Sequence, residues 1–408
     1  MKPLGPIPQG FGDKGGVLAI GAHDVEKLVE LGGGTPLFVY SRQMLVDRVA
    51  SLRAVLPAAV RVHYAIKANP YAPLLQVMSE LVDGFDVASG GELQKLLEIQ
   101  IAPGRVSFAG PGKRDAELAA AIAAGVTINL ESEGEAGRAL RLAEAAGVTP
   151  RLAIRVNPDF DLKGSGMKMG GGAKPFGVDA ERVPSLARRV VAAGAQWRGF
   201  HIFAGSQAIS ADAIIETQAQ TLALAARLAG ESGLPLPHLN LGGGFGIPYF
   251  PGDTELDITA VGVALAERMA SLPPELAETE FCLELGRWLV GEAGVYLATV
   301  IDRKVSHGEV FLVCDGGMHH QLAASGNFGT VVRRNYPVAI ATRFTAPVEE
   351  EASVVGCLCT PLDRLADKGG FPRAEPGDVV AVFCAGAYGA TASPMQFLGQ
   401  GPAREMLV

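Results

Sequence analysis

Lys67 lies in the run HYAIKANP (residues 63–70), where an alternating strand pattern breaks into a proline-containing turn. A lysine at a strand end faces whatever lies above the strand. An amine that loses hydration there has a lowered pKa and can attack a carbonyl carbon. The position therefore indicates a Schiff-base lysine, and the alternative is a solvated lysine at the protein surface.

A glycine triplet, Gly242, Gly243 and Gly244, indicates a second polar site. Glycine has no side chain, so its backbone N–H groups can approach an anion closely. In barrel proteins, phosphate sites often follow strands seven and eight, and Arg287 comes just after the eighth strand-like run. The triplet thus predicts a phosphate site, with a flexible turn as the alternative.

A phosphate site facing a strand-end lysine indicates pyridoxal phosphate, whose ring serves as an electron sink. Glu284 could hold the proton that the ring nitrogen needs, or it could form a salt bridge with Arg287. His201 lies between two apolar residues. It could stack on the cofactor ring or be a hydrogen-bonded core residue.

The elements that must position these residues are β-rich runs that alternate with Ala/Leu-rich segments of helical period. Eight such runs are Val62–Ile66, Gly84–Ala88, Arg105–Ala109, Val126–Leu130, Arg151–Val156, Gly199–Phe203, His238–Leu241 and Phe281–Leu285. Eight repeats over about 250 residues predict an α/β fold of the (β/α)8 barrel type. A doubly wound open sheet is the competing interpretation.

Barrel enzymes gather their chemistry at the carboxyl ends of the strands, and the polar residues fall there repeatedly. Lys67 follows the first run and Asp86 ends the second. His201 lies late in the sixth run with Ser206 just after it, and Glu284 closes the eighth.

After residue 290 the pattern changes to β-rich runs separated by Gly, Pro and Asp turn signals. The sequence therefore predicts a barrel domain over residues 37–288 and an all-β domain made of residues 1–36 and 289–408. Val17–Ile20 is expected to pair into the sheet of this second domain.

Composition excludes several classes of function. The 408 residues carry a formal net charge of -8 without a dense basic run, so neither nucleic acid nor an anionic membrane surface is an expected partner. Five cysteines, mostly in apolar runs, argue against a disulfide framework and for a reducing cytoplasm. No export or anchor segment is expected, small molecules are the expected partners, and no metal site is predicted.

Several motifs together resemble a known family. They are HYAIKAN (63–69), FDVASGGEL (85–93), LGGGFG (241–246), ELGR (284–287), CDGG (314–317), CLC (357–359) and GAYG (386–389). In combination they are similar to the fold-type III pyridoxal phosphate decarboxylases, which include diaminopimelate, ornithine and arginine decarboxylases. The runs GMHH (317–320) and RRNYP (333–337) resemble the exosortase-associated and glutamyl-carrier-protein decarboxylases within that family.

The resemblance implies a role for each matching residue. Lys67 would form the internal aldimine, His201 would stack on the ring and Glu284 would pair with the ring nitrogen. Cys359 would come from a partner subunit and reprotonate the carbanion, so the active sites would be shared across a homodimer. The remaining cofactor-binding or supporting positions would be Asp86, Glu92, Ser206, Gly242, Gly243, Gly244, Arg287 and Tyr388.

One departure from the family concerns the substrate. An acidic residue follows the active cysteine in the diaminopimelate and ornithine enzymes, whereas Thr360 follows Cys359 here. A distal ammonium would lose a counter-ion worth roughly 2–5 kcal/mol when desolvated. The candidate substrate-binding residues are Arg333, Arg334, Tyr336, Thr360, Asp363 and Tyr388. The two arginines could receive a carboxylate or phosphate or could be solvated surface residues, and Asp363 could be a displaced partner for an amine.

The predicted activity is α-decarboxylation of an L-amino acid or an aminoacyl derivative. The substrate is left open between a free amino acid, a carrier-bound aminoacyl group and a nucleotide-linked amino acid. An amino-acid racemase on the same fold and a non-catalytic cofactor-binding regulator are the alternatives. Glu284 disfavours the racemase, because racemases of this fold resemble an arrangement with arginine at the ring nitrogen.

Overall fold

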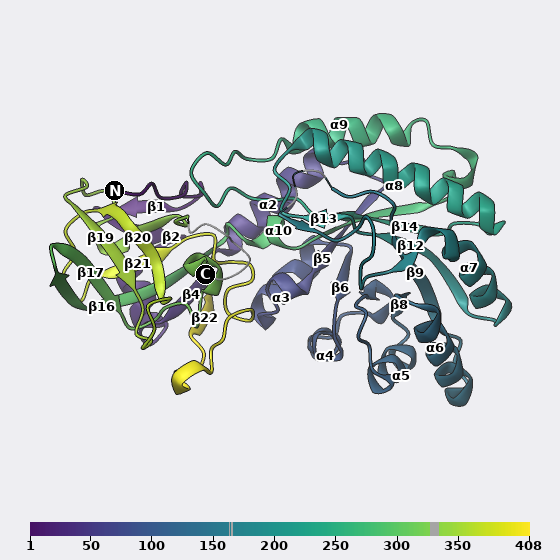
Figure 1. Ribbon diagram of the computed structural model, residues 1–408, viewed down its shortest axis with the longest axis horizontal. Helices are drawn as coiled ribbons and strands as arrows, with labels where there is room; N and C mark the ends of the chain where they lie inside the picture. The colour runs from purple at the N-terminus through teal and green to yellow at the C-terminus, as the bar shows by residue number, and fades with distance from the viewer. Residues whose placement is uncertain (163, 165, 327–333) are drawn as a thin grey trace. The chain divides into compact units, whose positions relative to one another are not determined.

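The computed structural model describes residues 1–162, 164, 166–326 and 334–408, which fold into two compact units (Figure 1). The barrel unit comprises Val49–Gly246 and Glu255–Gly286. The β unit comprises Met1–Arg48, Ile247–Thr254 and Arg287–Val408. The domain limits expected from the sequence, 37–288 for the barrel, stay a prediction.

Eight parallel strands of the barrel unit form a closed barrel. In chain order they are β5 (Val60–Ala65), β6 (Gly84–Val87), β7 (Val106–Phe108), β8 (Thr127–Leu130), β9 (Arg151–Asn157), β12 (Gln196–Ile202), β14 (His238–Gly243) and β15 (Glu280–Leu285). The strand order is β9-β12-β14-β15-β5-β6-β7-β8, and β8 also pairs with β9, which closes the ring. The predicted (β/α)8 barrel is confirmed, and the doubly wound open sheet is wrong because this last pairing leaves no open edge.

Helices alternate with these strands and lie around the outside of the barrel (Figure 1). They are α3 (Ala72–Leu81), α4 (Gly90–Glu98), α5 (Asp115–Ala124), α6 (Glu133–Ala146), α7 (Val183–Ala192), α8 (Ala211–Ser232) and α9 (Ile258–Met269), while α2 (Arg42–Val55) crosses from one unit into the other. Local sequence sets their ends. The Ser89 side chain caps α4 by accepting from the Glu92 N–H, and Gly233 ends α8 in the left-handed conformation.

Three short strands accompany the barrel. β10 (Met167–Lys168) pairs antiparallel with β13 (Gly205–Ser206), and β11 (Val178–Asp179) pairs parallel with the end of β9. β13 therefore fixes the segment that carries Ser206, just beyond the end of β12.

The β unit is built around an eight-stranded sheet, which confirms the predicted second, mostly β domain. Its strands are β4 (Leu37–Tyr40), β16 (Gly294–Ser306), β17 (Glu309–Cys314), β18 (Val338–Ile340), β19 (Glu350–Val355), β20 (Arg364–Phe371), β21 (Val379–Val382) and β22 (Arg404–Leu407). The main path is β18-β21-β16-β17-β19-β20, and β4 joins through β16 and β22. The short helices α1 (Val25–Leu31) and α10 (Arg287–Val290) belong to the same unit.

The N-terminal segment differs from the expectation. Val17–Ile20 forms β2 of a separate three-stranded sheet with β1 (Gly12–Lys14) and β3 (His23–Asp24), and does not join the large sheet. Gly15 and Gly16 have positive φ angles and close a two-residue hairpin between β1 and β2, so the strand finds its partner locally. Its buried Leu18 and Ile20 still pack into the hydrophobic core of the β unit.

Among the described residues, no helix combines the length and the hydropathy that crossing a bilayer would require.

Candidate functional site

Lys67 lies in a short 3-10 turn, Ile66–Ala68, directly after β5. Asn69 precedes Pro70 and is extended, as a residue before proline prefers, so the turn cannot continue as a helix. The hydroxyl of Tyr64 donates to the Asn69 carbonyl at 2.8 Å, and Ile66 is buried. The backbone is thus fixed before Lys67 by the buried Ile66 and after it by the hydrogen bond to Asn69.

The Lys67 amine lies beside the buried Glu284 carboxylate. Nζ is 3.6 Å from Oε1 of Glu284 and 5.4 Å from the ring centre of Phe203. The lysine side chain is 41% exposed. The loss of hydration expected from the sequence is therefore wrong for the protein alone, because this end of the strand opens to solvent.

The Glu284 side chain of β15 contacts side chains from two other parts of the barrel. Its Oε2 lies 2.8 Å from Nε2 of His201, so the carboxylate of β15 contacts a base from β12 and the lysine that follows β5. Burial alone would raise the pKa of Glu284, but the charge of Lys67 and the contact with His201 outweigh it and lower the pKa. The site therefore holds an ionised carboxylate with a basic group at each oxygen, and the alternative pairing with Arg287 is not needed to satisfy it.

Asp86 and Glu92 occupy the next strand end. Asp86 is buried at the end of β6, and its Oδ2 lies 3.3 Å from Nδ1 of His63. Glu92, in the first turn of α4, accepts a hydrogen bond from the Ala88 N–H at 2.6 Å, and burial raises its pKa. Both residues therefore support the backbone and side chains at this end of the strand.

The glycine triplet is required by the packing of β14 against its neighbours. A Cβ on Gly243 would lie 2.0 Å from the Glu284 carbonyl oxygen, and one on Gly244 would lie 2.2 Å from the Gly205 carbonyl oxygen. Gly242 has a φ of +70°, which a residue with a side chain rarely adopts. The turn therefore lies directly against backbone carbonyl groups of β15 and of the segment that carries Ser206, and the Gly242 N–H donates to Oδ1 of Asn240 at 2.8 Å. The phosphate site stays a prediction.

Arg287 and the predicted aromatic residues gather within the β unit. The Arg287 guanidinium donates to the Tyr249 hydroxyl at 2.7 Å and lies 4.7 Å from the ring centre of Tyr388. Burial raises the pKa of Tyr249 to about 12, so its hydroxyl stays protonated. The Tyr336 ring is buried 4.8 Å from the ring of Tyr249. The sequence motifs gave no signal for Tyr249.

The residues around Cys359 differ in exposure. Cys359 is exposed. Asp363 is buried, and its oxygens accept from the N–H groups of Met318 at 2.6 Å and Leu358 at 2.9 Å. These contacts favour a structural role for Asp363 over that of an amine partner. Thr360 is half-buried in the same turn.

Only one of the two predicted arginines can be placed. Arg334 is exposed, and its guanidinium lies 3.9 Å from the ring centre of Phe250. Arg333 lies outside the described residues.

Two residues near the lysine and the carboxylates were not singled out from the sequence. Phe203 comes just after β12 and contacts Lys67, while His63 lies within β5 and contacts Asp86. Position at or near a strand end was the available signal for both. The Phe203 side chain indicates no chemistry, whereas the His63 imidazole can act as an acid, a base or a ligand.

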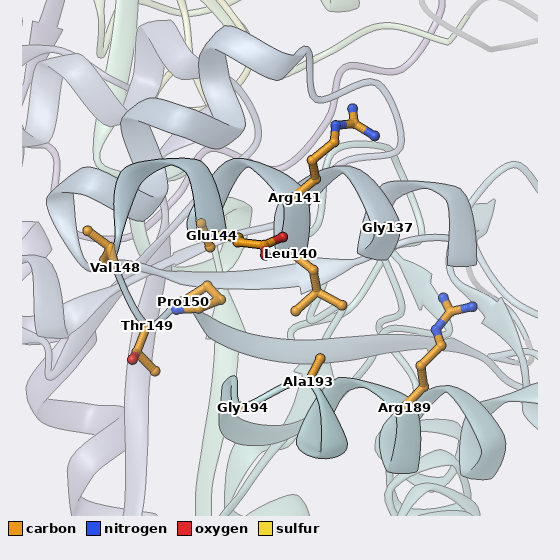
Figure 2. Close-up of a pocket in the computed structure, with 11 residues that line it drawn as sticks. Gly137, Leu140, Arg141, Glu144, Val148, Thr149, Pro150, Arg189, Ala193 and Gly194 are labelled. Atoms are coloured by element: carbon orange, nitrogen blue, oxygen red, sulfur yellow. The ribbon is translucent and has the colours of Figure 1, made fainter.

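A surface cavity of about 670 Å³ lies away from these groups. It is formed by α6, α7 and the segment after α6 on the outside of the barrel, with Leu140, Arg141, Pro150 and Arg189 among its lining (Figure 2). None of the predicted site residues lines it, so its chemistry is unrelated to that of Lys67.

Comparison with known proteins gives this arrangement a family. Residues 42–291 match the model of the pyridoxal-dependent decarboxylases, pyridoxal binding domain. The chain is 34% identical over 384 residues to the L-glutamyl-[BtrI acyl-carrier protein] decarboxylase of Niallia circulans, a match covering 91% of this chain and 88% of that protein. It is 31% identical over 368 residues to the diaminopimelate decarboxylase of Aquifex aeolicus, covering 87% and 82% of the two chains.

A solved structure agrees in fold. The diaminopimelate decarboxylase of Helicobacter pylori, complexed with L-lysine, superposes with a TM-score of 0.83 at 24% identity, and the match covers 94% of each chain. With the family model and the curated relatives, these findings establish that the chain belongs to the pyridoxal-dependent decarboxylases and that its cofactor is pyridoxal phosphate.

Proposed function

We propose that the chain decarboxylates an amino acid, or an aminoacyl group attached to a carrier, that bears no distal ammonium group. The observation that carries the assignment of roles is the convergence of Lys67 and His201 on the ionised carboxylate of Glu284. The racemase and the non-catalytic regulator are not favoured, because the named relatives are decarboxylases.

The barrel residues fit the cofactor. When bound, pyridoxal phosphate supplies an electron sink for the pair left behind as carbon dioxide departs. Lys67 would hold the cofactor through its exposed amine, and the glycine turn with Ser206 would supply backbone and hydroxyl groups for an anion. Glu284 is kept ionised, so it can hold a proton on a heterocyclic nitrogen. His201 fixes the carboxylate in place and offers a ring face, while Asp86 supports the same strand ends.

The other roles rest on the family resemblance. Arg287 and Tyr388 hold the phosphate and its surroundings, and their contact at 4.7 Å supports their acting together. Cys359, exposed in the β unit, donates the proton that replaces the carboxylate, and it does so in the active site of a partner subunit. The chain is then an obligate homodimer.

Substrate choice follows from the turn after Cys359. Thr360, Pro361 and Leu362 carry no charge that could hold a distal ammonium. Arg333 and Arg334 are the proposed partners of a distal carboxylate or phosphate, and Tyr336 and Tyr388 are further proposed substrate-binding residues. The carrier-bound glutamyl substrate in the name of one relative supports this class. Asp363 stays a predicted substrate residue, although its backbone contacts favour the structural role.

The decisive experiment measures carbon dioxide release from a panel of substrates. Free L-glutamate and glutamyl-carrier protein represent the proposed class, and diaminopimelate and L-ornithine represent substrates with a distal ammonium. A missing counter-ion worth roughly 2–5 kcal/mol corresponds to a kcat/KM roughly 30- to 5,000-fold lower for the ammonium substrates. Diaminopimelate as the best substrate would contradict the proposal.

The role of Cys359 and the shared site are tested with variants. Cys359→Ala should slow turnover while cofactor binding persists, and Cys357→Ala, two residues away, is the matched control that should keep its rate. Mixing inactive Lys67→Ala and Cys359→Ala subunits should restore part of the activity. Demonstrated heterodimers without any recovery would refute a site built from two subunits.

A further inference from the structure

A second group of chemically active side chains lies inside the barrel, below the strand-end residues. His63 of β5, His238 of β14 and Cys282 of β15 each present one ligand atom, and these atoms all lie within 4.8 Å of one another. The three strands are adjacent, in the order β14-β15-β5. None of the three residues has a role in the proposed reaction.

We propose that these three side chains bind a divalent transition-metal ion of the zinc class. Zinc takes cysteine sulfur at about 2.3 Å and histidine nitrogen at about 2.0–2.1 Å in tetrahedral geometry. Those bond lengths place neighbouring ligand atoms roughly 3.3–3.6 Å apart. Separations of at most 4.8 Å must therefore shorten by up to about 1.5 Å, through rotation of the three side chains.

The surroundings provide two further features of a metal site. Asp86 Oδ2 lies 3.3 Å from Nδ1 of His63, and a metal-bound histidine usually presents its other ring nitrogen to such a carboxylate. A cavity of about 80 Å³ is lined by His63 and His238 together with Asn240. A few water molecules fit in this volume, so a water can complete the coordination.

The neighbouring groups can supply the negative charge that a cation needs. The Asp86 carboxylate lies 3.3 Å from His63, and the Cys282 thiol would lose its proton to solvent when a metal ion binds.

Three arginines, Arg61, Arg105 and Arg198, line the same cavity as the two histidines, and their charges oppose a cation. The thiolate of Cys282 and the carboxylate of Asp86 together balance the two charges of the ion.

The bound ion would tie three strands together one layer below the catalytic groups. Cys282 lies two residues before Glu284 on β15, and His63 pairs in register with Glu284. The ion is thus a structural link that fixes the strand ends carrying Lys67 and Glu284. The competing interpretation is a hydrogen bond between the Cys282 thiol and a histidine ring in the barrel core, without a bound ion.

The test uses the full-length holoenzyme, stripped with a chelator, reloaded with zinc and dialysed. We expect one zinc per chain, and X-ray absorption at the zinc edge should show one sulfur neighbour at about 2.3 Å with nitrogen or oxygen neighbours at about 2.0–2.1 Å. Cys282→Ser should remove the sulfur neighbour, and Asp86→Asn should weaken zinc affinity roughly 10- to 100-fold.

The double variant Cys357→Ser/Cys359→Ser is the matched control, because it removes the two cysteines that are not fully buried and should bind zinc as the wild type does. Less than about a tenth of an equivalent of zinc in the wild type would overturn the proposal. Loss of the sulfur signal in the double variant would overturn it as well. If Cys282→Ser does not fold, His238→Gln replaces it and should lower the affinity at least tenfold.

Discussion

Replacing Gly243 by alanine should distort the barrel at the end of β15, the strand that carries Glu284. The added Cβ would lie 2.0 Å from the Glu284 carbonyl oxygen and 2.8 Å from Cδ2 of Leu285, whereas ordinary contacts of a Cβ are 3.4–4 Å. The nearest obstacle is backbone, so no side chain can rotate away. β14 and β15 must move apart by about an ångström or more.

The expected loss of stability follows from this overlap. Overpacking typically costs about 1–3 kcal/mol, and a clash with backbone belongs at or above the upper end of that range. For a unit of this size about 1 kcal/mol shifts Tm by roughly 2–4 °C. Gly243→Ala should therefore lower the Tm of the cofactor-free protein by about 6–12 °C. Affinity for pyridoxal phosphate should fall as well, because Glu284 moves with its strand.

Gly137→Ala is the matched control. Gly137 lies in α6, is exposed and would have nothing within 4 Å of an added Cβ. Alanine is favoured over glycine in a helix by about 0.5–1 kcal/mol, so Tm should rise by about 1–4 °C. Differential scanning calorimetry and a cofactor titration measure both variants. Because about 1 kcal/mol shifts Tm by roughly 2–4 °C, a Tm for Gly243→Ala within about 2 °C of the wild type would refute the packing argument.

Three other predictions concern charged groups. Lys67→Ala should lose all borohydride-trapped cofactor, measured by mass spectrometry of the intact chain, and a remaining adduct would place the attachment elsewhere. Lys113 Nζ lies 2.6 Å from Oε1 of Glu135, with the two side chains 1% and 2% exposed, so Lys113→Met should cost about 3–5 kcal/mol of unfolding free energy. Arg114→Ala, on the surface, should leave Tm nearly unchanged, and equal losses for the two variants would contradict this contrast. Folding lowers the pKa of Glu284, so its contribution to stability is present above its unfolded pKa of about 4.3 and is lost progressively as pH falls below that value toward the lowered pKa of the folded state. Glu284→Gln should therefore lose less Tm than the wild type between pH 7 and about pH 3, and parallel pH profiles would show that the carboxylate is not held ionised by folding.

The sequence by itself determined the barrel and the residues at its catalytic end. Strand and helix periods alternate eight times, and Lys67, His201 and Glu284 each lie at or near the end of a strand-like run. The carboxyl ends of parallel strands meet at one edge, so residues far apart in the chain could be assigned to one site without coordinates. The separate hairpin of Val17–Ile20 was missed, because a local glycine turn competes with the larger sheet.

Only the tertiary structure decided how these groups act on one another. The ionised state of Glu284 depends on contacts of 3.6 Å and 2.8 Å with bases from two other strands, and no sequence spacing encodes such distances. The packing need for Gly243 and the backbone contacts of Asp363 came from neighbours distant in the chain. The cluster of His63, His238 and Cys282 likewise appears only when three strands lie side by side. Electrostatic and steric effects act through space between residues that are distant in the chain, and both depend on separations that the sequence does not report.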